Sequence, residues 1–229
     1  MRFICKNYVR FRSGVSNPYV LVDALHAVNP RGEVFTDEIA ERVSADAGCH
    51  CIVSTVSREE ADLNRHPDSK NRLAVQEYRQ TIGDLLAESR LLDARTRLRF
   101  PFLHLSLHGM RDRPNKDIEL GTCFGKSCSD EYLFWILTRF RQWASDLANS
   151  PPEPKIVDND PEDALYGHPV IATHRCGEKY SGYAGYGPKF NTVQVELAYW
   201  LRKKHREELV TLLTSIADEF RALATSSER

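Results

Sequence analysis

The stretch Phe102-Leu-His-Leu-Ser-Leu-His-Gly-Met110 carries two histidines, His104 and His108, four residues apart in an apolar run. On a helix this spacing would place both on one face as a metal-binding pair, and on a strand both would also point the same way. The run has a short β-rich core, opens at Pro101 and closes at Gly109, so a strand is favoured. On a strand the two histidines lie roughly 13 Å apart, too far for one metal ion with bonds of about 2 Å. His108, at the strand end, is therefore the candidate ligand, and His104 is expected in the core.

Strands and helices alternate on both sides of this stretch. Runs of β-branched or alternating apolar residues favour strands, whereas apolar spacing of 3.6 residues with capping and stop residues favours helices. The expected strands are 17–27, 51–57, 102–110, 167–174 and 192–201. The expected helices are 36–48, 73–92, 130–148 and 206–224. The alternation predicts an α/β sandwich with a largely parallel or mixed sheet.

Bulk composition excludes several classes of protein. The 229 residues carry a formal net charge of −1, so no basic balance indicates nucleic acid or an anionic membrane surface as a partner. No apolar run approaches the roughly 20 residues of a membrane span, and the first residues lack the pattern of a signal peptide. We expect a single cytoplasmic domain over 1–229, with a Pro-rich connector near 149–163.

The six cysteines do not predict a metal site. They include the pairs in "CHC" (49–51) and "CFGKSC" (123–128), but thiolate zinc sites usually show two C-x2-C-like pairs. Reduced thiols that pack as small hydrophobic side chains are expected instead.

Polar residues with suitable chemistry lie where expected strands end. A catalytic zinc ion takes three protein ligands and keeps one position open for water, and His26, Glu33 and His108 would supply such a set. Zinc lowers the pKa of bound water to about 7 and polarises a carbonyl. Glu196 lies inside the apolar strand "TVQVEL", where a carboxylate is costly unless it is paired or used, so it is a candidate general base.

The polar segment 58–72 supplies further donors. Arg58 and Arg65 are cationic, and Asn64 adds an amide. Arginine binds carboxylates through two parallel hydrogen bonds, so this segment suits a small substrate that bears a carboxylate. The sequence has no G-x-G-x-x-G, P-loop, G-x-S-x-G or H-E-x-x-H motif.

Four motifs in order resemble a known family. They are "SREEADLNR" (57–65), "LHLSLHGM" (103–110), "IELGTCFGKSC" (118–128) and "NTVQVEL" (191–197). Together they resemble the N-formylglutamate amidohydrolase family, which belongs to the zinc carboxypeptidase and aspartoacylase-like group. The segment "EVFTDEIA" (33–40) is also similar to a stretch of a related phage poly-γ-glutamate hydrolase, in which the glutamate is a zinc ligand.

The resemblance implies a three-layer α/β/α sandwich around a mixed, mostly parallel sheet, and one zinc ion per chain. The implied zinc ligands are His26, Glu33 and His108. The residues implied to hold the substrate carboxylate or its polarised carbonyl are Arg58, Asn64 and Arg65. The implied catalytic residues are Arg65 and Glu196, the latter as general base and then as proton donor to the leaving amine.

The chain also departs from the family pattern. Its first motif is "LHAV" (25–28) where the family has "PHSG" or "PHGG", and six residues separate His26 from Glu33. The alternative carboxylate ligands are therefore Asp23, Asp37 and Glu38.

The function implied by the resemblance is a zinc-dependent amidohydrolase acting on a small acidic N-acyl amino acid, similar to N-formylglutamate. Two alternatives stay open. One is a peptidase or a γ-glutamyl or cell-wall amidase on the same scaffold, and the other is a metal-free binding module.

Overall fold

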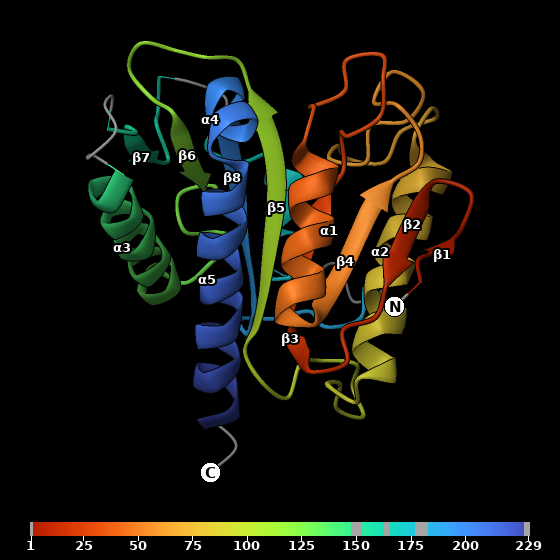
Figure 1. Cartoon of the computed structure of the whole chain (residues 1–229). Helices are drawn as coiled ribbons and strands as arrows, with labels where there is room; N and C mark the ends of the chain where they lie inside the picture. Colours follow the sequence, from red (N-terminus) through yellow and green to blue (C-terminus); the bar gives the residue numbers. More distant parts are fainter. Residues whose placement is uncertain (1, 148–152, 163–164, 177–182, 227–229) are drawn as a thin grey trace.

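The computed structural model describes residues 2–147, 153–162, 165–176 and 183–226. An eight-stranded sheet has the order β1-β2-β4-β3-β5-β8-β6-β7 (Figure 1). The strands are β1 (Ile4–Cys5), β2 (Val9–Arg12), β3 (Asn17–Ala24), β4 (Cys49–Ser54), β5 (Phe102–Met110), β6 (Ile118–Gly121), β7 (Ile156–Asp158) and β8 (Phe190–Ala198). The helices are α1 (Thr36–Ala47), α2 (Arg72–Glu88), α3 (Asp130–Leu147), α4 (Tyr199–Lys204) and α5 (Arg206–Ser226), with a 3-10 turn, η1 (Pro169–Ala172).

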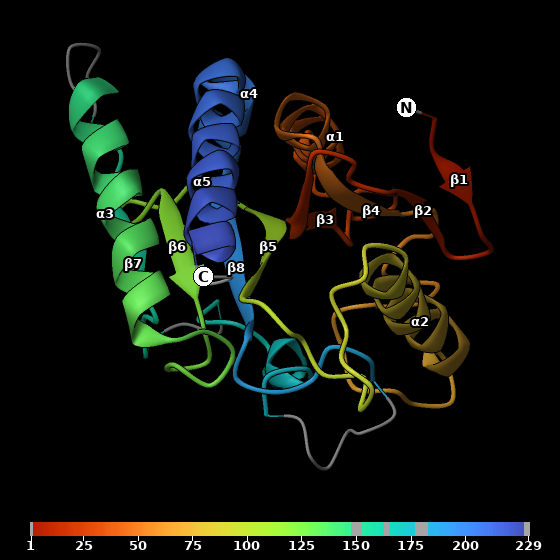
Figure 2. The same cartoon turned by 90° about the horizontal axis from the view of Figure 1, so that it is seen from below.

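Helices cover both faces of the sheet, so the predicted three-layer sandwich is confirmed. Helices α1, α3 and α5 lie on one face, and α2 lies on the other (Figure 2). The larger apolar cluster joins α1, α3 and α5 to the sheet, and a second cluster joins α2 to it.

The four central strands run parallel, which decides where the site forms. β3 pairs with β4 and with β5, and β5 pairs with β8, all in parallel, whereas β2 and β6 run antiparallel to their central neighbours. The carboxyl ends of the parallel strands therefore meet at one edge, where ligands bind in open α/β sheets.

β5 is buried on both faces, but its two faces differ in chemistry. Leu103, Leu105 and Leu107 belong to the cluster with α1, α3 and α5. His104, Ser106 and His108 point to the other face, because successive side chains on a strand alternate. The quoted stretch is thus a strand, as expected, with one polar and one apolar face.

The sequence-based strand at 167–174 is wrong. The structure has the 3-10 turn η1 there, with Pro169 in its first turn. Proline has no N–H to donate to a strand ladder, and His168 Nδ1 accepts a hydrogen bond from Val170 N instead. In the connector, residues 149–152 and 163 lie outside the described residues, and the described part contains the unexpected strand β7.

Membrane insertion can be judged for the described helices alone. None of them combines the length and the apolar character needed to cross a bilayer.

Candidate metal centre

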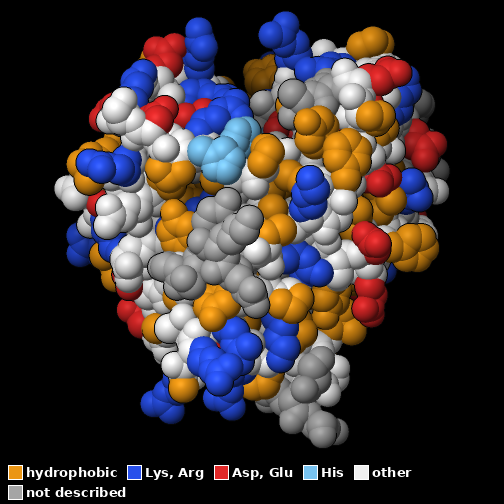
Figure 3. All heavy atoms as spheres, turned by 180° about the vertical axis from the view of Figure 1, so that it is seen from behind, with side chains coloured by type: hydrophobic (Ala, Val, Ile, Leu, Met, Phe, Trp, Pro, Cys, Tyr) orange, Lys and Arg blue, Asp and Glu red, His pale blue; other side chains and the backbone are white. Residues whose placement is uncertain are grey.

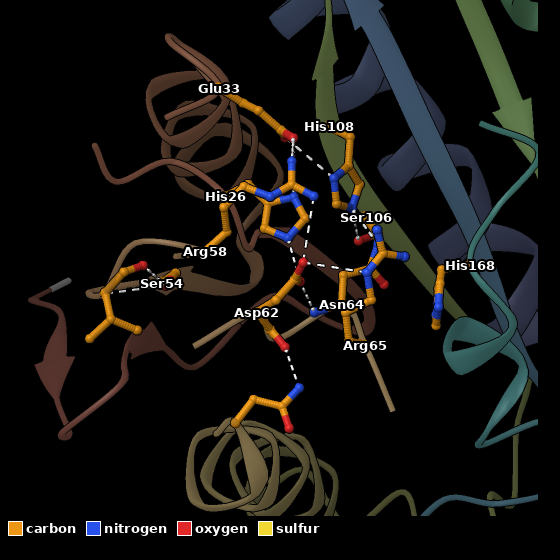
Figure 4. A network of polar contacts seen from close by, with 12 residues as sticks. His26, Glu33, Ser54, Arg58, Asp62, Asn64, Arg65, Ser106, His108 and His168 are labelled. Carbon is orange, nitrogen blue, oxygen red and sulfur yellow. Dashed lines mark hydrogen bonds and ion pairs between the residues drawn. The ribbon is translucent and has the colours of Figure 1, made fainter. Parts of the chain in front are cut away.

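Three predicted ligands converge at the carboxyl edge of the sheet. His26 follows β3, Glu33 precedes α1, and His108 lies near the end of β5. Glu33 Oε1 is 3.1 Å from His26 Nδ1, and Glu33 Oε2 is 3.3 Å from His108 Nδ1. Figure 4 shows the three side chains pointing toward one another. Their candidate ligand atoms all lie within 4.8 Å of one another, and within the described residues they form the one such group.

The longer spacing between His26 and Glu33 is accommodated by a closed loop. Glu33 N donates to His26 O over 2.7 Å, so the chain returns to its starting point. Gly32 allows this turn, because a Cβ there would lie 2.8 Å from Ala27 O. The hydroxyl of Thr36 then donates to Glu33 O over 2.7 Å and fixes the glutamate at the start of α1.

The three alternative carboxylates are placed elsewhere. Asp23 is fully buried beneath the site, Asp37 lies 4.0 Å from Arg10, and Glu38 pairs with Arg206. The geometry therefore favours Glu33, which the sequence had left open.

Sequence reasoning missed Asp62, although it lies inside the "DLNR" motif. Asp62 Oδ1 lies 2.8 Å from His26 Nε2, the nitrogen that faces away from Glu33. Burial would raise the pKa of Asp62, but His26 and Arg58 outweigh this and hold the pKa well below its usual range. Histidine ligands usually bond a carboxylate through their second nitrogen, which orients the ring. This general rule could have indicated from the sequence that a carboxylate such as Asp62 accompanies a histidine ligand.

We expect Asp62→Asn to weaken zinc binding by about 10–100-fold, the usual effect of losing such a partner. The amide cannot supply the negative charge that orients His26. Competition with a chromophoric chelator would measure the zinc affinity, with Asp46→Asn on the exposed end of α1 as the matched control. An unchanged affinity in Asp62→Asn would contradict the assignment.

A buried network lies behind His108. Its Nε2 is 3.3 Å from Ser106 Oγ, which donates to Asp23 Oδ1 over 2.7 Å. Asp23 Oδ2 is 2.7 Å from His104 Nε2 and accepts from Tyr78 Oη over 2.5 Å. His104 is therefore a buried residue separated from the candidate ligand His108 by Ser106 and Asp23, as its position in the strand indicated.

Glu196 faces the same cavity from β8. It is the register partner of His108 across the β5–β8 ladder. Its side chain is buried, and Oε1 accepts from Gln194 Nε2 over 2.9 Å. Burial raises the pKa of Glu196, and the neighbouring His108 offsets part of this rise. A carboxylate with a raised pKa is suited to take up a proton and return it.

The predicted donors of segment 58–72 lie at different depths. Arg58 Nη1 donates to Glu33 Oε1 over 3.3 Å. Asn64 is buried, and its Nδ2 donates to Gln194 Oε1 over 3.2 Å. Arg65 reaches the mouth of the cavity with its side chain half exposed.

The cavity has a volume of about 240 Å³ and basic walls. Arg58 and Arg65 line the cavity from the segment between β4 and α2. Arg111 and Arg113, which the sequence did not single out, line it from the segment after β5. Figure 3 shows lysine and arginine side chains on both sides of a notch at this end of the molecule. The lining favours an anionic ligand.

The donor set fits a zinc ion. Two imidazole nitrogens and one carboxylate are a common catalytic set. The second nitrogens of His26 and His108 lie against Asp62 and Ser106, which fixes both rings.

Zinc binding should strengthen as pH rises. Burial would lower the pKa of His108, but the Glu33 carboxylate outweighs this and raises it to about 9. His108 is protonated below that pH, and a metal needs the neutral imidazole, so binding must displace a proton. We expect the apparent Kd to fall by about tenfold per pH unit between pH 6 and 8. Titration calorimetry in buffers of different ionisation enthalpy would count the protons released. A pH-independent affinity over this range would contradict this expectation.

The comparisons with known proteins identify the fold. No family model matches the sequence, and no curated protein matches it. The mixed sheet and the converging donor residues define the chain as an α/β protein with a candidate metal centre at the strand ends. Its fold is that of N-formylglutamate amidohydrolase from Ralstonia eutropha JMP134, whose crystal structure gives a TM-score of 0.65 at 16% identity, over 96% of this chain and 99% of that chain.

A second solved structure supports the same fold. A bacteriophage poly-γ-glutamate hydrolase gives a TM-score of 0.55 at 13% identity, over 96% of this chain and 93% of that chain. The resemblance drawn from the four motifs is therefore confirmed at the level of the fold.

Proposed function

We propose that this chain is a zinc-dependent amidohydrolase that cleaves the amide bond of a small acidic N-acyl amino acid, similar to N-formylglutamate. The observation that carries the proposal is the convergence of His26, Glu33 and His108 beside the buried Glu196. The names of the two similar structures, an amidohydrolase and a hydrolase, support it.

The ligand set would supply one part of the chemistry. His26, Glu33 and His108 would hold a zinc ion, which would lower the pKa of a bound water and polarise a carbonyl. Glu196 takes a proton from the attacking water and returns it to the leaving nitrogen, for which its buried position and raised pKa are suited. Arg58, whose Nη1 lies 3.3 Å from Glu33 Oε1, would donate to the carbonyl oxygen as negative charge develops there.

The basic cavity walls indicate the substrate class. A cavity of about 240 Å³ is small for a binding site, which favours a short acyl amino acid over a peptide. Arg65 at its mouth would bind a substrate carboxylate.

We expect Arg65→Met to raise KM by about 10–100-fold, because a hydrogen bond to a charged group contributes about 1.5–3 kcal/mol. kcat should change much less if Arg65 acts in binding. Steady-state kinetics would check this, with Arg95→Met in an exposed loop as the control. A lower kcat at unchanged KM would instead place Arg65 at the reacting carbonyl.

A γ-glutamyl amidase is the second candidate. A neighbouring open hollow of about 700 Å³ shares Arg58 and Arg65 with the cavity and adds Arg31 and Lys70, so that its four basic side chains outnumber its two carboxylates, Glu59 and Asp62. An acidic chain longer than one residue would extend across it.

The decisive experiment combines metal analysis with a substrate panel. We expect about one zinc ion per chain and faster release of amine from N-formyl- or N-acetylglutamate than from their neutral counterparts. γ-Glutamyl amino acids and short peptides test the second candidate and the peptidase alternative. Less than about half an equivalent of zinc after supplementation would favour a metal-free binding module instead.

A further inference from the structure

Arg202, on α4, is a buried cation behind the candidate metal centre. It is 3% exposed. Its Nε donates to Leu197 O over 3.0 Å, its Nη2 donates to Met110 O over 3.1 Å, and its Nη1 donates to Val34 O. Within the described residues its bonded partners are these three carbonyls, and no carboxylate is among them.

The three acceptors share one property: each lies one or two residues after a residue of the site. The pairs are Glu33–Val34, His108–Met110 and Glu196–Leu197. One guanidinium therefore bonds the backbone next to two candidate ligands and next to the candidate base. These segments come from distant parts of the sequence.

Strand pairing joins two of these three segments, and the third segment, the loop of Glu33, takes no part in that pairing. The segments of His108 and Glu196 lie in β5 and β8, which pair along their whole length. The loop of Glu33 forms no ladder with either strand. Its bonds to this end of β5 and β8 run through Glu33 itself, whose Oε2 accepts from Gly109 N over 2.9 Å, and through the bond from Arg202 to Val34 O.

The space for the guanidinium depends on Gly109. A Cβ at this position would lie 2.6 Å from Arg202 Cζ, closer than atoms pack. The Arg202 guanidinium therefore packs against the Cα of Gly109, and the N–H of the same glycine donates to Glu33.

The chemistry of arginine explains why an apolar side chain would not suffice. Burial of a cation costs free energy unless the cation is hydrogen-bonded. If the only task were to fill the space, an apolar side chain of similar volume would do so at a lower cost in free energy. The guanidinium adds directed donors in a rigid planar fork. Lysine, a point charge on a flexible stem, cannot reproduce that fork.

We propose that Arg202 is a positioning residue that fixes the Glu33 loop against the ends of β5 and β8. The role rests on the proposed function, because it sets the geometry of that same site. Glu33 contacts both histidines, so a shift of its loop would separate the ligand atoms.

The test uses Arg202→Met, Arg202→Lys and Gly109→Ala in the full chain. Arg139→Met, which changes a partly exposed arginine paired with Glu219, is the matched control. Zinc affinity is measured by chelator competition. Hydrogen exchange of the zinc-free proteins is measured for the amide of Glu33, which bonds His26 O.

We expect both Arg202 variants to bind zinc about 10–100-fold more weakly than the wild type. Exchange at Glu33 should be faster in both, while exchange in the β5–β8 ladder is unchanged. Gly109→Ala keeps Arg202 but displaces its guanidinium, so it should shift both measurements in the same direction. A merely structural role would lower the melting temperature without this local pattern.

The inference would be overturned if Arg202→Met folds, exchanges its Glu33 amide as fast as the wild type, and binds zinc with an affinity within about twofold of the wild type. If that variant does not fold, Arg202→Lys and Gly109→Ala decide by the same criteria. If the wild type binds no zinc, the proposed function fails, and the exchange measurement alone still decides whether Arg202 positions the loop.

Discussion

Replacing Glu196 by glutamine should lower kcat by about 10²- to 10⁴-fold, the range that general acid–base catalysis contributes. Glutamine keeps the size of the side chain but cannot take a proton from water or return it to the amine. The substrate is the fastest acyl amino acid of the panel, and the zinc content is measured on the same samples. About one equivalent of zinc should remain, because Glu196 lies outside the three-residue ligand group.

The matched control is Glu208→Gln, an exposed carboxylate in the first turns of α5. It should leave kcat, KM and the zinc content as in the wild type. Glu196→Gln with zinc bound and full turnover would show that another group moves the proton.

Replacing His108 by alanine should lower zinc affinity by well over 100-fold, beyond the ~10–100-fold that loss of an outer partner costs. The change removes one of the three converging donors and leaves Glu33 with His26 alone. Inductively coupled plasma analysis after dialysis against buffer would check the zinc content, which should approach zero.

The matched control is the other histidine of the same strand. His104→Gln removes a ring that bonds Asp23 within the buried network, so it should lower the free energy of unfolding by about 1–3 kcal/mol. Its zinc content should stay near one equivalent. Zinc loss in His104→Gln with zinc retained in His108→Ala would reverse the two roles.

Local sequence patterns predicted all four strands of the parallel centre of the sheet, including β4 through the expected strand 51–57. β3, β5 and β8 are apolar or alternating runs, and the sequence marked each of them. The short flanking strands β1, β2, β6 and β7 were missed, because two to four residues carry too little periodicity to be recognised. The order of the strands was not readable, since it depends on contacts between distant segments.

The candidate site shows a similar division. Residues with distinctive chemistry in distinctive places, such as His108 at a strand end and Glu196 in an apolar run, were singled out from the sequence, and the structure brings both to one cavity. Asp62 and Arg202 were missed, because their importance depends on which atoms they meet in three dimensions. Aspartate in a polar loop and arginine in a basic helical run look like ordinary surface residues until the fold brings them to the site.

The place of β8 within the sheet has a consequence for biosynthesis. β8 is the last strand in the sequence, yet it lies between β5 and β6 rather than at an edge. Until residues 190–198 have been translated and have left the ribosome, β5 and β6 have no strand to join them, and the candidate site lacks Glu196. Such long-range pairing is slow to form. We therefore expect the candidate site to be completed only after β8 has been translated, later than all three candidate metal ligands.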